Sequence, residues 1–146
     1  MKNAFYLLLI ICFALACKAP KAKTAPPTDE KLEALKANDT VVIANDKLEY
    51  EIIIIEPGFN FWLASRARQR GYYSQFFMES RNRIMVIEWN QRVLNPSQYN
   101  PSLYEMQINY QQNIDYGYEV NYVLYNYFIY FQLTYNQRLG PFKPRI

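Results

Sequence analysis

Five acidic side chains in the second half of the chain are the candidate acids and bases for catalysis. They are Glu79, Glu88, Glu105, Asp115 and Glu119. Two carboxyl groups facing each other across a cleft, roughly 5–10 Å apart, can cleave a glycosidic bond. The spacing of these five residues singles out no pair. A cell-wall or glycan hydrolase with paired carboxylates is therefore the alternative function, and we assign no catalytic residue.

The absence of histidine from all 146 residues removes several other kinds of catalytic site. Histidine is the usual general base near neutral pH, the partner of serine and cysteine nucleophiles, and a common metal ligand. The chain also has no run of Asp and Glu with the spacing of oxygen ligands to a metal. We therefore expect no metal and no cofactor, and we favour a non-enzymatic role.

Cys17 has the most specific chemistry of any residue in the chain. It follows a basic start at Lys2, an apolar run from Ala4 to Leu15 and the small residue Ala16. This order is typical of a signal peptide, residues 1–16, that ends at a lipoprotein cleavage site. The apolar run is too short for a membrane-spanning helix, which needs roughly 20 residues. We predict that Cys17 is lipidated and anchors the mature chain to a membrane.

Ordinary secretion is the alternative at this site. Leu15 departs from the usual lipoprotein pattern, in which leucine lies three residues before the cysteine, and Ala14-Leu15-Ala16 also fits ordinary signal cleavage. Cys12, the other cysteine, lies within the apolar run and is expected to leave with the signal peptide. With Cys17 acylated, the mature chain then has neither a disulfide nor a catalytic thiol.

Tyrosine is unusually frequent, with 14 copies, and offers a second kind of chemistry. Its ring is flat and apolar while its hydroxyl donates and accepts hydrogen bonds, so tyrosine-rich surfaces bind sugars, peptides and proteins. A possible interaction patch surrounds the turn at residues 115–117 and consists of Tyr116, Tyr118, Tyr122 and Tyr125. The alternative is that these rings line the core and present only their hydroxyls to solvent.

Arginines form the third candidate group, because guanidinium groups bind carboxylates and phosphates in a bidentate manner. The group contains Arg66, Arg68, Arg70, Arg81 and Arg83, and a solvated basic face is its alternative interpretation. The net charge of the chain is +3. An exported chain meets lipid head groups and cell wall before nucleic acid, so we expect no nucleic-acid partner.

Composition divides the chain into three parts. After the signal peptide, residues 17–39 are rich in Pro, Ala and Lys and free of aromatic residues, which indicates a tether that cannot fold alone. Residues 40–146 have the length of a single domain with one core. The fold class expected for this domain is α+β, with an N-terminal β-hairpin, a buried Ile-rich strand, about three helices and an aromatic C-terminal helix.

Local patterns predict the elements of the domain. Residues 40–44 and 48–56 form the hairpin around a turn at 45–47, and the apolar run at 52–55 is expected to be covered on both faces. A helix is predicted over residues 61–70, capped by Asn60 and ended by Gly71. A longer helix is predicted over residues 74–94, starting at Ser74. A strand around the unbroken apolar patch at 84–87 is the alternative for part of this stretch.

The C-terminal half is expected to contain one strand and one helix. Alternation of apolar and polar residues predicts a strand over residues 105–111. The last helix is predicted over residues 119–138 and ends at Gly140-Pro141. Because it is apolar nearly all round, we expect it to be central, and a pocket beneath it would suit a small ligand.

Several segments of the domain together resemble a known family: YEIIIIEPGFNFWL, RGYYSQFF, EWNQRV, NPSLYEMQINY and NIDYGYEVNYVLYNYF. The chain resembles small uncharacterised lipoproteins of Gram-negative envelopes that are described only as a domain of unknown function. The resemblance implies a location and supplies no activity and no site residues. With the predicted anchor, it implies an outer-membrane lipoprotein, and the lack of acidic residues directly after Cys17 favours the periplasmic side. We therefore expect a binding or assembly protein whose partner is another envelope protein or the cell wall.

Overall fold

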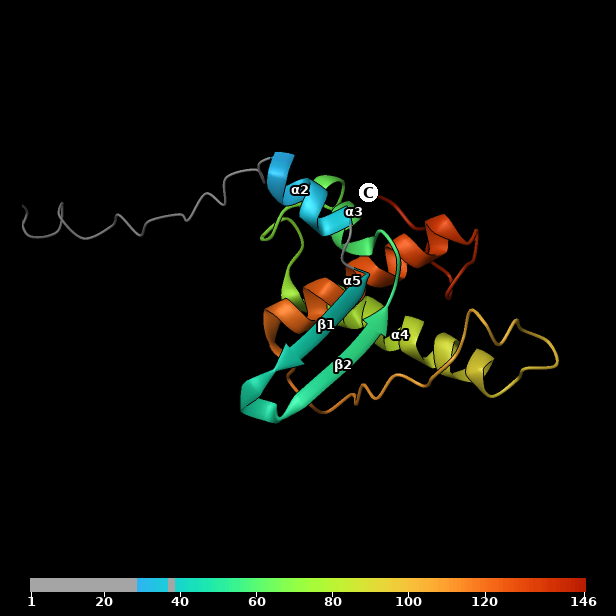
Figure 1. Ribbon diagram of the computed structural model, residues 1–146. Helices are drawn as coiled ribbons and strands as arrows, with labels where there is room; N and C mark the ends of the chain where they lie inside the picture. Colours follow the sequence, from blue (N-terminus) through green and yellow to red (C-terminus); the bar gives the residue numbers. More distant parts are fainter. Residues whose placement is uncertain (1–28, 37–38) are drawn as a thin grey trace, which may run out of the picture.

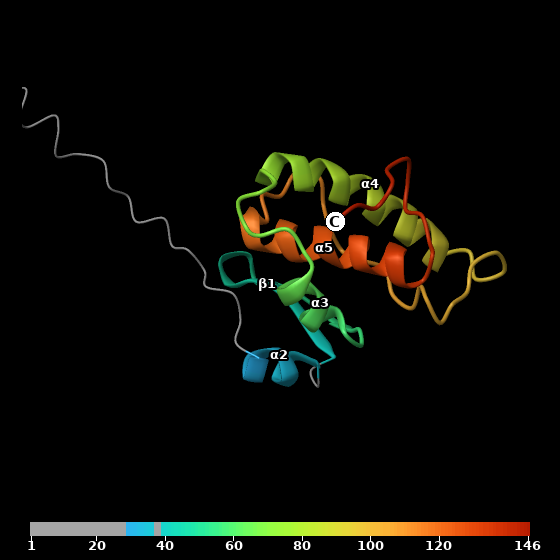
Figure 2. The same ribbon diagram turned by 90° about the horizontal axis from the view of Figure 1, so that it is seen from above.

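Two long helices, α4 (Gln75–Val93) and α5 (Gly117–Thr134), form the centre of the computed structural model, which describes residues 29–36 and 39–146. They pack side by side and run in the same direction (Figures 1 and 2). A short turn cannot join parallel neighbours, so residues 94–116 return along the helices before α5 begins. With the hairpin described below, this arrangement confirms the predicted α+β class.

The predicted start of α4 at Ser74 is confirmed. The Ser74 Oγ accepts a hydrogen bond from the backbone N–H of Phe77 at 3.2 Å, which satisfies one donor that the first helical turn leaves unpaired. The helix ends at Val93, shortly before Asn95-Pro96, because the residue before a proline is driven away from helical conformation.

Helix α5 is buried on nearly all sides, as its apolar surface predicts. It ends at Thr134, however, rather than near residue 138. Asn136 has a φ of 50°, and the N–H of Gln137 reaches back to the carbonyl of Gln132 at 3.0 Å. The α-helix thus ends with one residue in the left-handed backbone conformation, which asparagine adopts more readily than most residues. Asn136 therefore ends the helix, and the expectation that Gly140-Pro141 does so is wrong.

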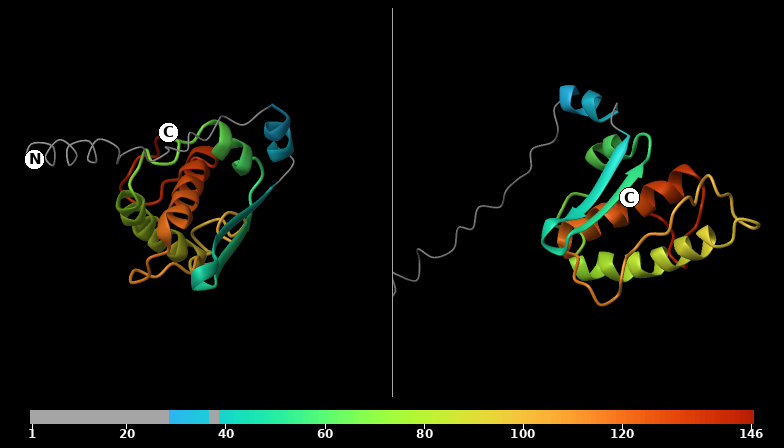
Figure 3. Two further views of the ribbon diagram at one scale, coloured as in Figure 1. Left: turned by 90° about the vertical axis from the view of Figure 1, so that its left-hand side faces the viewer. Right: turned by 60° about the horizontal axis from the view of Figure 1, so that its bottom comes forward.

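The predicted hairpin consists of β1 (Thr40–Asn45) and β2 (Tyr50–Ile55), joined by the 3-10 turn η1 (Asp46–Leu48). The strands are antiparallel, and their register pairs Val41 with Ile54 and Ile43 with Ile52. The inner face of the hairpin packs on α5 and on α3 (Phe59–Ser65). Figure 3 shows the hairpin as an outer layer of the molecule.

The outer face of the hairpin carries apolar side chains in contact with solvent. Ile53 is 52% exposed and Ile55 is 77% exposed, beside the half-exposed Val42 on β1. The expectation that the Ile run is covered on both faces is wrong, because the helices of the described residues pack on one side of the hairpin only. An uncovered apolar face is thus a feature of this domain.

Helix α3 is shorter than predicted and begins differently. It spans Phe59–Ser65, and its N-cap is Gly58, with a φ of 78° and no side-chain cap. Asn60, the predicted cap, instead donates a hydrogen bond to the carbonyl of Thr40 at 2.7 Å. Gly71 has a left-handed φ of 87° within a loop and does not end a helix.

The strand predicted over residues 105–111 is absent; this segment lies beside α4 without a ladder of backbone hydrogen bonds. Side chains of α4 bind its backbone instead. The indole N–H of Trp89 donates to the carbonyl of Met106 at 2.9 Å, and the amide of Asn90 exchanges two hydrogen bonds with Ile108 at 2.8 and 2.9 Å. These bonds satisfy the backbone groups that a neighbouring strand would otherwise satisfy.

The N-terminal part of the described chain is the helix α2 (Asp29–Lys36), which contacts α3 and lies within the predicted tether. The predicted signal peptide, Cys17 and the rest of the tether up to residue 28 lie outside the described residues. Between residue 29 and the C-terminus, no described helix is both long enough and apolar enough to cross a membrane.

Candidate functional site

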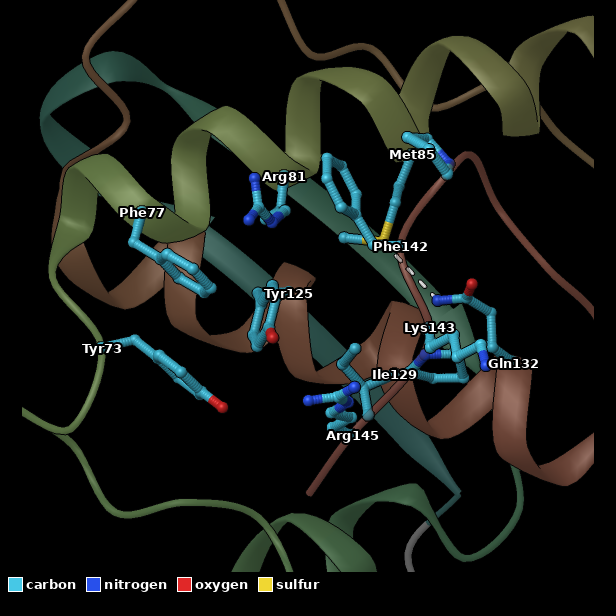
Figure 4. Close-up of a pocket in the computed structure, with 12 residues that line it drawn as sticks. Tyr73, Phe77, Arg81, Met85, Tyr125, Ile129, Gln132, Phe142, Lys143 and Arg145 are labelled. Atoms are coloured by element: carbon cyan, nitrogen blue, oxygen red, sulfur yellow. Dashed lines mark hydrogen bonds between the residues drawn. The ribbon is translucent and has the colours of Figure 1, made fainter.

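A cavity of about 440 Å³ lies between α4 and α5 and is covered by residues 141–145 near the C-terminus (Figure 4). We call it the α4–α5 pocket. Its volume lies within the range of small-molecule sites. The residues that line it are Tyr73, Phe77, Arg81, Met85, Tyr125, Ile129, Gln132, Pro141, Phe142, Lys143, Pro144 and Arg145.

Aromatic rings form one wall of the pocket. The rings of Tyr73 and Phe77 are stacked, with centroids 4.8 Å apart. Tyr125 on α5 meets both of them edge-on, at 5.4 and 6.0 Å. Edge-to-face and stacked pairs hold ring positions firmly, so this wall is pre-formed rather than assembled around a ligand.

Three cationic side chains, Arg81, Lys143 and Arg145, line the same pocket, and no carboxylate does. The guanidinium carbon of Arg81 lies 3.8 Å from the ring centroid of Phe142 and 4.7 Å from that of Phe77. The two rings hold the guanidinium by cation–π attraction, which does not neutralise its positive charge. The pocket therefore has positive charge beside an apolar aromatic wall.

The C-terminal segment owes its position over the pocket to Gly140. This glycine has a φ of 84°, and a Cβ placed on it would lie 2.9 Å from the Cγ2 of Ile84 on α4. Leu139 before it is fully buried and donates its N–H to the Oε1 of Gln132 at 2.7 Å. Only glycine fits this close, left-handed approach.

Replacement of Gly140 by alanine is expected to lower the free energy of unfolding by about 2 kcal/mol, from left-handed strain together with the clash against Ile84. Gly71→Ala is the matched control, because Gly71 has a similar φ of 87° but no atom within 4 Å of the added Cβ. It should cost only the strain, about 1 kcal/mol. Urea denaturation measures both values. Equal losses in the two variants would contradict the packing of residue 140 against α4.

Comparison with family models shows which protein family the chain belongs to. A family described as "Family of unknown function (DUF6146)" matches residues 5–143. The chain belongs to this family. No curated protein and no solved structure matches it. Membership confirms the coarse part of the resemblance seen in the sequence, an uncharacterised family that covers nearly all of the folded part, and it supplies no site residues.

The tyrosines proposed as an interaction patch do not share an exposed face in the DUF6146 chain. Tyr116, Tyr122 and Tyr125 are buried, and Tyr118 is partly exposed. Their hydroxyls hold backbone segments against α5. Tyr122 donates to the carbonyl of Arg68 at 2.7 Å, Tyr118 accepts from the N–H of Gly71 at 2.6 Å, and Tyr116 accepts from the N–H of Gln111 at 2.9 Å. Tyr125 alone of the four lines the α4–α5 pocket.

The phenols of Tyr122 and Tyr125 also stay protonated. Burial raises the pKa of Tyr125 and of Tyr122 above the usual value for tyrosine, although the nearby Arg70 opposes the shift at Tyr122. The ring of Tyr125 therefore adds no negative charge that would compete with an anion for Arg81.

The candidate carboxylates lie apart from the pocket, and three of them are paired with arginines. Glu79 pairs with Arg83, Glu88 with Arg92 at 3.8 Å, and Glu119 with Arg70 at 2.9 Å. Asp115 accepts a hydrogen bond from the side-chain amide of Gln75 at 2.6 Å. Glu105 is exposed beside a second cavity, next to β2. Within residues 29–36 and 39–146, no group of three or more Cys, Asp or Glu side chains could hold a metal ion.

Glu56 is the site residue that the sequence analysis missed. It is only 6% exposed and lines the cavity next to β2. The hydroxyl of Tyr135 donates to its Oε1 at 2.9 Å. Burial raises the pKa of Glu56, and hydrogen bonds from Tyr135 and Tyr127 oppose that shift. The signal in the sequence was a single charge directly after four isoleucines and before Pro57-Gly58, where the strand ends.

Proposed function

We propose that this protein is a lipid-anchored envelope lipoprotein that binds a small anionic ligand in the α4–α5 pocket without catalysing a reaction. The ligand carries an apolar or ring-bearing part, which packs on the wall formed by Tyr73, Phe77 and Tyr125. Its anionic group contacts Arg81 and the cations of the C-terminal segment. Transfer of a bound ligand to another envelope protein or to the cell wall fits a tethered binding protein.

The observation that carries this proposal is the charge of the pocket lining. Its three cations face no lining carboxylate, whereas Arg70, Arg83 and Arg92 elsewhere in the described chain all form ion pairs. An arginine guanidinium without an acidic neighbour can bind a carboxylate, sulfonate or phosphate group through its N–H donors. The low polarity of the adjoining rings strengthens that interaction, because fewer water molecules screen it.

An aromatic sulfonate tests the pocket directly. We expect 8-anilinonaphthalene-1-sulfonate to bind the purified full chain with increased fluorescence, and Arg81→Gln to weaken binding at least about tenfold, the value of one lost charge-assisted contact. Arg66→Gln is the matched control, since Arg66 is exposed and does not line the pocket. Equal affinities of the Arg81→Gln and Arg66→Gln chains would reject the pocket as an anion site.

The anchor is tested separately in cells. The proposal places the mature chain on the periplasmic side of the outer membrane, with Cys17 carrying acyl chains. A palmitate analogue should label the wild-type chain, and Cys17→Ala should lose the label and move from the membrane fraction to the soluble fraction. Label retained by the Cys17→Ala chain would contradict lipidation at this residue.

A further inference from the structure

A second cavity, of about 340 Å³, lies between the edge of β2 and residues 102–108. We call it the β2 groove. It shares no residue with the α4–α5 pocket. Trp89 and Tyr127 contribute to its lining, Met106 and Ile108 form part of the side opposite β2, and Glu56 lies at the end of the strand. Next to the groove, Tyr50 at the start of β2 links the strand to the opposite segment, because its hydroxyl donates to the carbonyl of Asn109 at 2.7 Å.

The backbone of β2 has unpaired groups on the side that faces this groove. Within the part of the chain that the structure describes, the sheet has two strands, so one edge of β2 has no neighbouring strand. The N–H of Glu56 donates to the carbonyl of Asp39 at 2.7 Å. This bond shows which residues of β2 direct their backbone groups toward β1 and which direct them away. Because an antiparallel ladder uses every second residue, the N–H and carbonyl groups of Ile53 and Ile55 point away from β1. Such an edge is a template for one more strand.

The charge of the groove is negative. Glu56 and Glu105 line it, and no lysine or arginine does. The ion pairs found among the described residues use other carboxylates and leave Glu56 with phenolic partners only. A buried carboxylate without a counter-ion is costly, and the raised pKa of Glu56 reflects that cost. A cation that enters the groove would lower the energetic cost of keeping the Glu56 carboxylate buried.

We propose that an extended segment of a partner protein, with a lysine or arginine at an inward-facing position, adds to β2 as a third strand and places that cation against Glu56. The side chains on either side of the cation lie on the outer face of the sheet. There they meet Ile53 and Ile55, so they are apolar. The segment therefore has the pattern apolar–basic–apolar, in which backbone hydrogen bonds give affinity and the alternate side chains give specificity.

This assignment goes beyond the proposed ligand function, because it concerns another surface and a macromolecular partner. Charge complementarity decides between occupants. A second copy of β2 would bring its own Glu51, Ile53 and Ile55 to the edge and no cation for Glu56. A purely apolar strand would leave the buried carboxylate of Glu56 without a counter-ion, with its phenolic hydrogen bonds only.

The probe is a fluorescein-labelled peptide, Thr-Val-Lys-Val-Thr, titrated with the full chain in detergent and followed by fluorescence anisotropy. We expect Glu56→Gln to weaken binding at least about tenfold, and replacement of the peptide lysine by norleucine to have the same effect on the wild-type chain. The two changes together should lose little more than either alone. Peptide binding should also slow amide hydrogen exchange at Ile53 and Ile55, because a third strand covers those groups.

Glu51→Gln is the matched control, because it removes the same charge from the same strand on its exposed outer face. It should change peptide affinity by less than about twofold. Urea denaturation of the Glu56→Gln chain establishes that it is folded. The proposal is overturned if the norleucine peptide binds the wild-type chain as tightly as the lysine peptide. It is also overturned if sedimentation shows a dimer that Ile53→Lys dissociates, since a second copy then occupies the edge.

Discussion

Asn121→Ala is expected to lower the free energy of unfolding by about 3–4 kcal/mol, the combined cost of a cavity and of unpaired buried polar groups. Asn121 on α5 is fully buried, and so is Asn82 on α4. The Oδ1 of Asn121 accepts from the Tyr110 hydroxyl at 2.7 Å and from the Asn82 amide at 3.1 Å. The Asn121 amide donates to the carbonyl of Gly117 at 2.9 Å. One side chain thus links both helices and the return segment.

A double-mutant cycle separates this polar linkage from simple loss of volume. Tyr110→Phe alone should cost about 1 kcal/mol, because it removes one donor while the ring remains in place. In the Asn121→Ala background the same change should cost almost nothing, since the Tyr110 hydroxyl has already lost its acceptor. Urea denaturation of the four chains gives the coupling energy. Additive losses would show that the hydroxyl and the amide act independently.

Elements with a local cause were predictable from the sequence. The Ser74 cap and the hairpin turn each depend on residues within a few positions of one another, and the all-round apolar surface of α5 correctly indicated a central helix. The end of α5 was missed, because Asn136 competes with Gly140 for the left-handed position. Both residues have positive φ, and only the structure shows which one ends the helix.

The prediction of a strand at residues 105–111 was wrong for a reason that the alternation of apolar and polar residues cannot reveal. Ile108 and Tyr110 are buried, as the pattern required, but Met106, the first apolar residue of the alternation, is 64% exposed. Their segment, however, is held by Trp89 and Asn90, about twenty residues earlier in the chain, rather than by another strand. Side-chain partners of that kind leave no periodic signature.

The pocket could be predicted only in part. Arg81 was among the candidate arginines, but the sequence placed it in one group with Arg70 and Arg83. The structure pairs Arg70 with Glu119 and Arg83 with Glu79, and leaves Arg81 between two rings. The aromatic wall combines Tyr73 and Phe77 with Tyr125, which lies 48 residues after Phe77 in the chain, and the cations Lys143 and Arg145 come from the C-terminal segment. Their meeting depends on the parallel packing of α4 and α5.

Trp89→Ala is expected to lower the free energy of unfolding by about 4 kcal/mol. Trp89 is buried, and its ring lies 4.8 Å from that of Phe131, 5.0 Å from Tyr104 and 5.9 Å from Tyr127, measured between centroids. Loss of the indole leaves a cavity that these rings cannot fill without giving up their own contacts. Leu94→Ala, at the exposed C-cap of the same helix, should change stability by less than about 0.5 kcal/mol.

Trp89→Phe separates the two roles of this residue. A phenyl ring retains most of the packing, so we expect a loss of about 1–2 kcal/mol, but it removes the N–H that holds the carbonyl of Met106. Amide hydrogen exchange should then become faster at Ile108 and remain unchanged along α5. Because Met106 and Ile108 form one side of the β2 groove, the Trp89→Phe chain should also bind the lysine peptide more weakly. Unchanged exchange at Ile108 would mean that the Asn90 amide alone positions this segment.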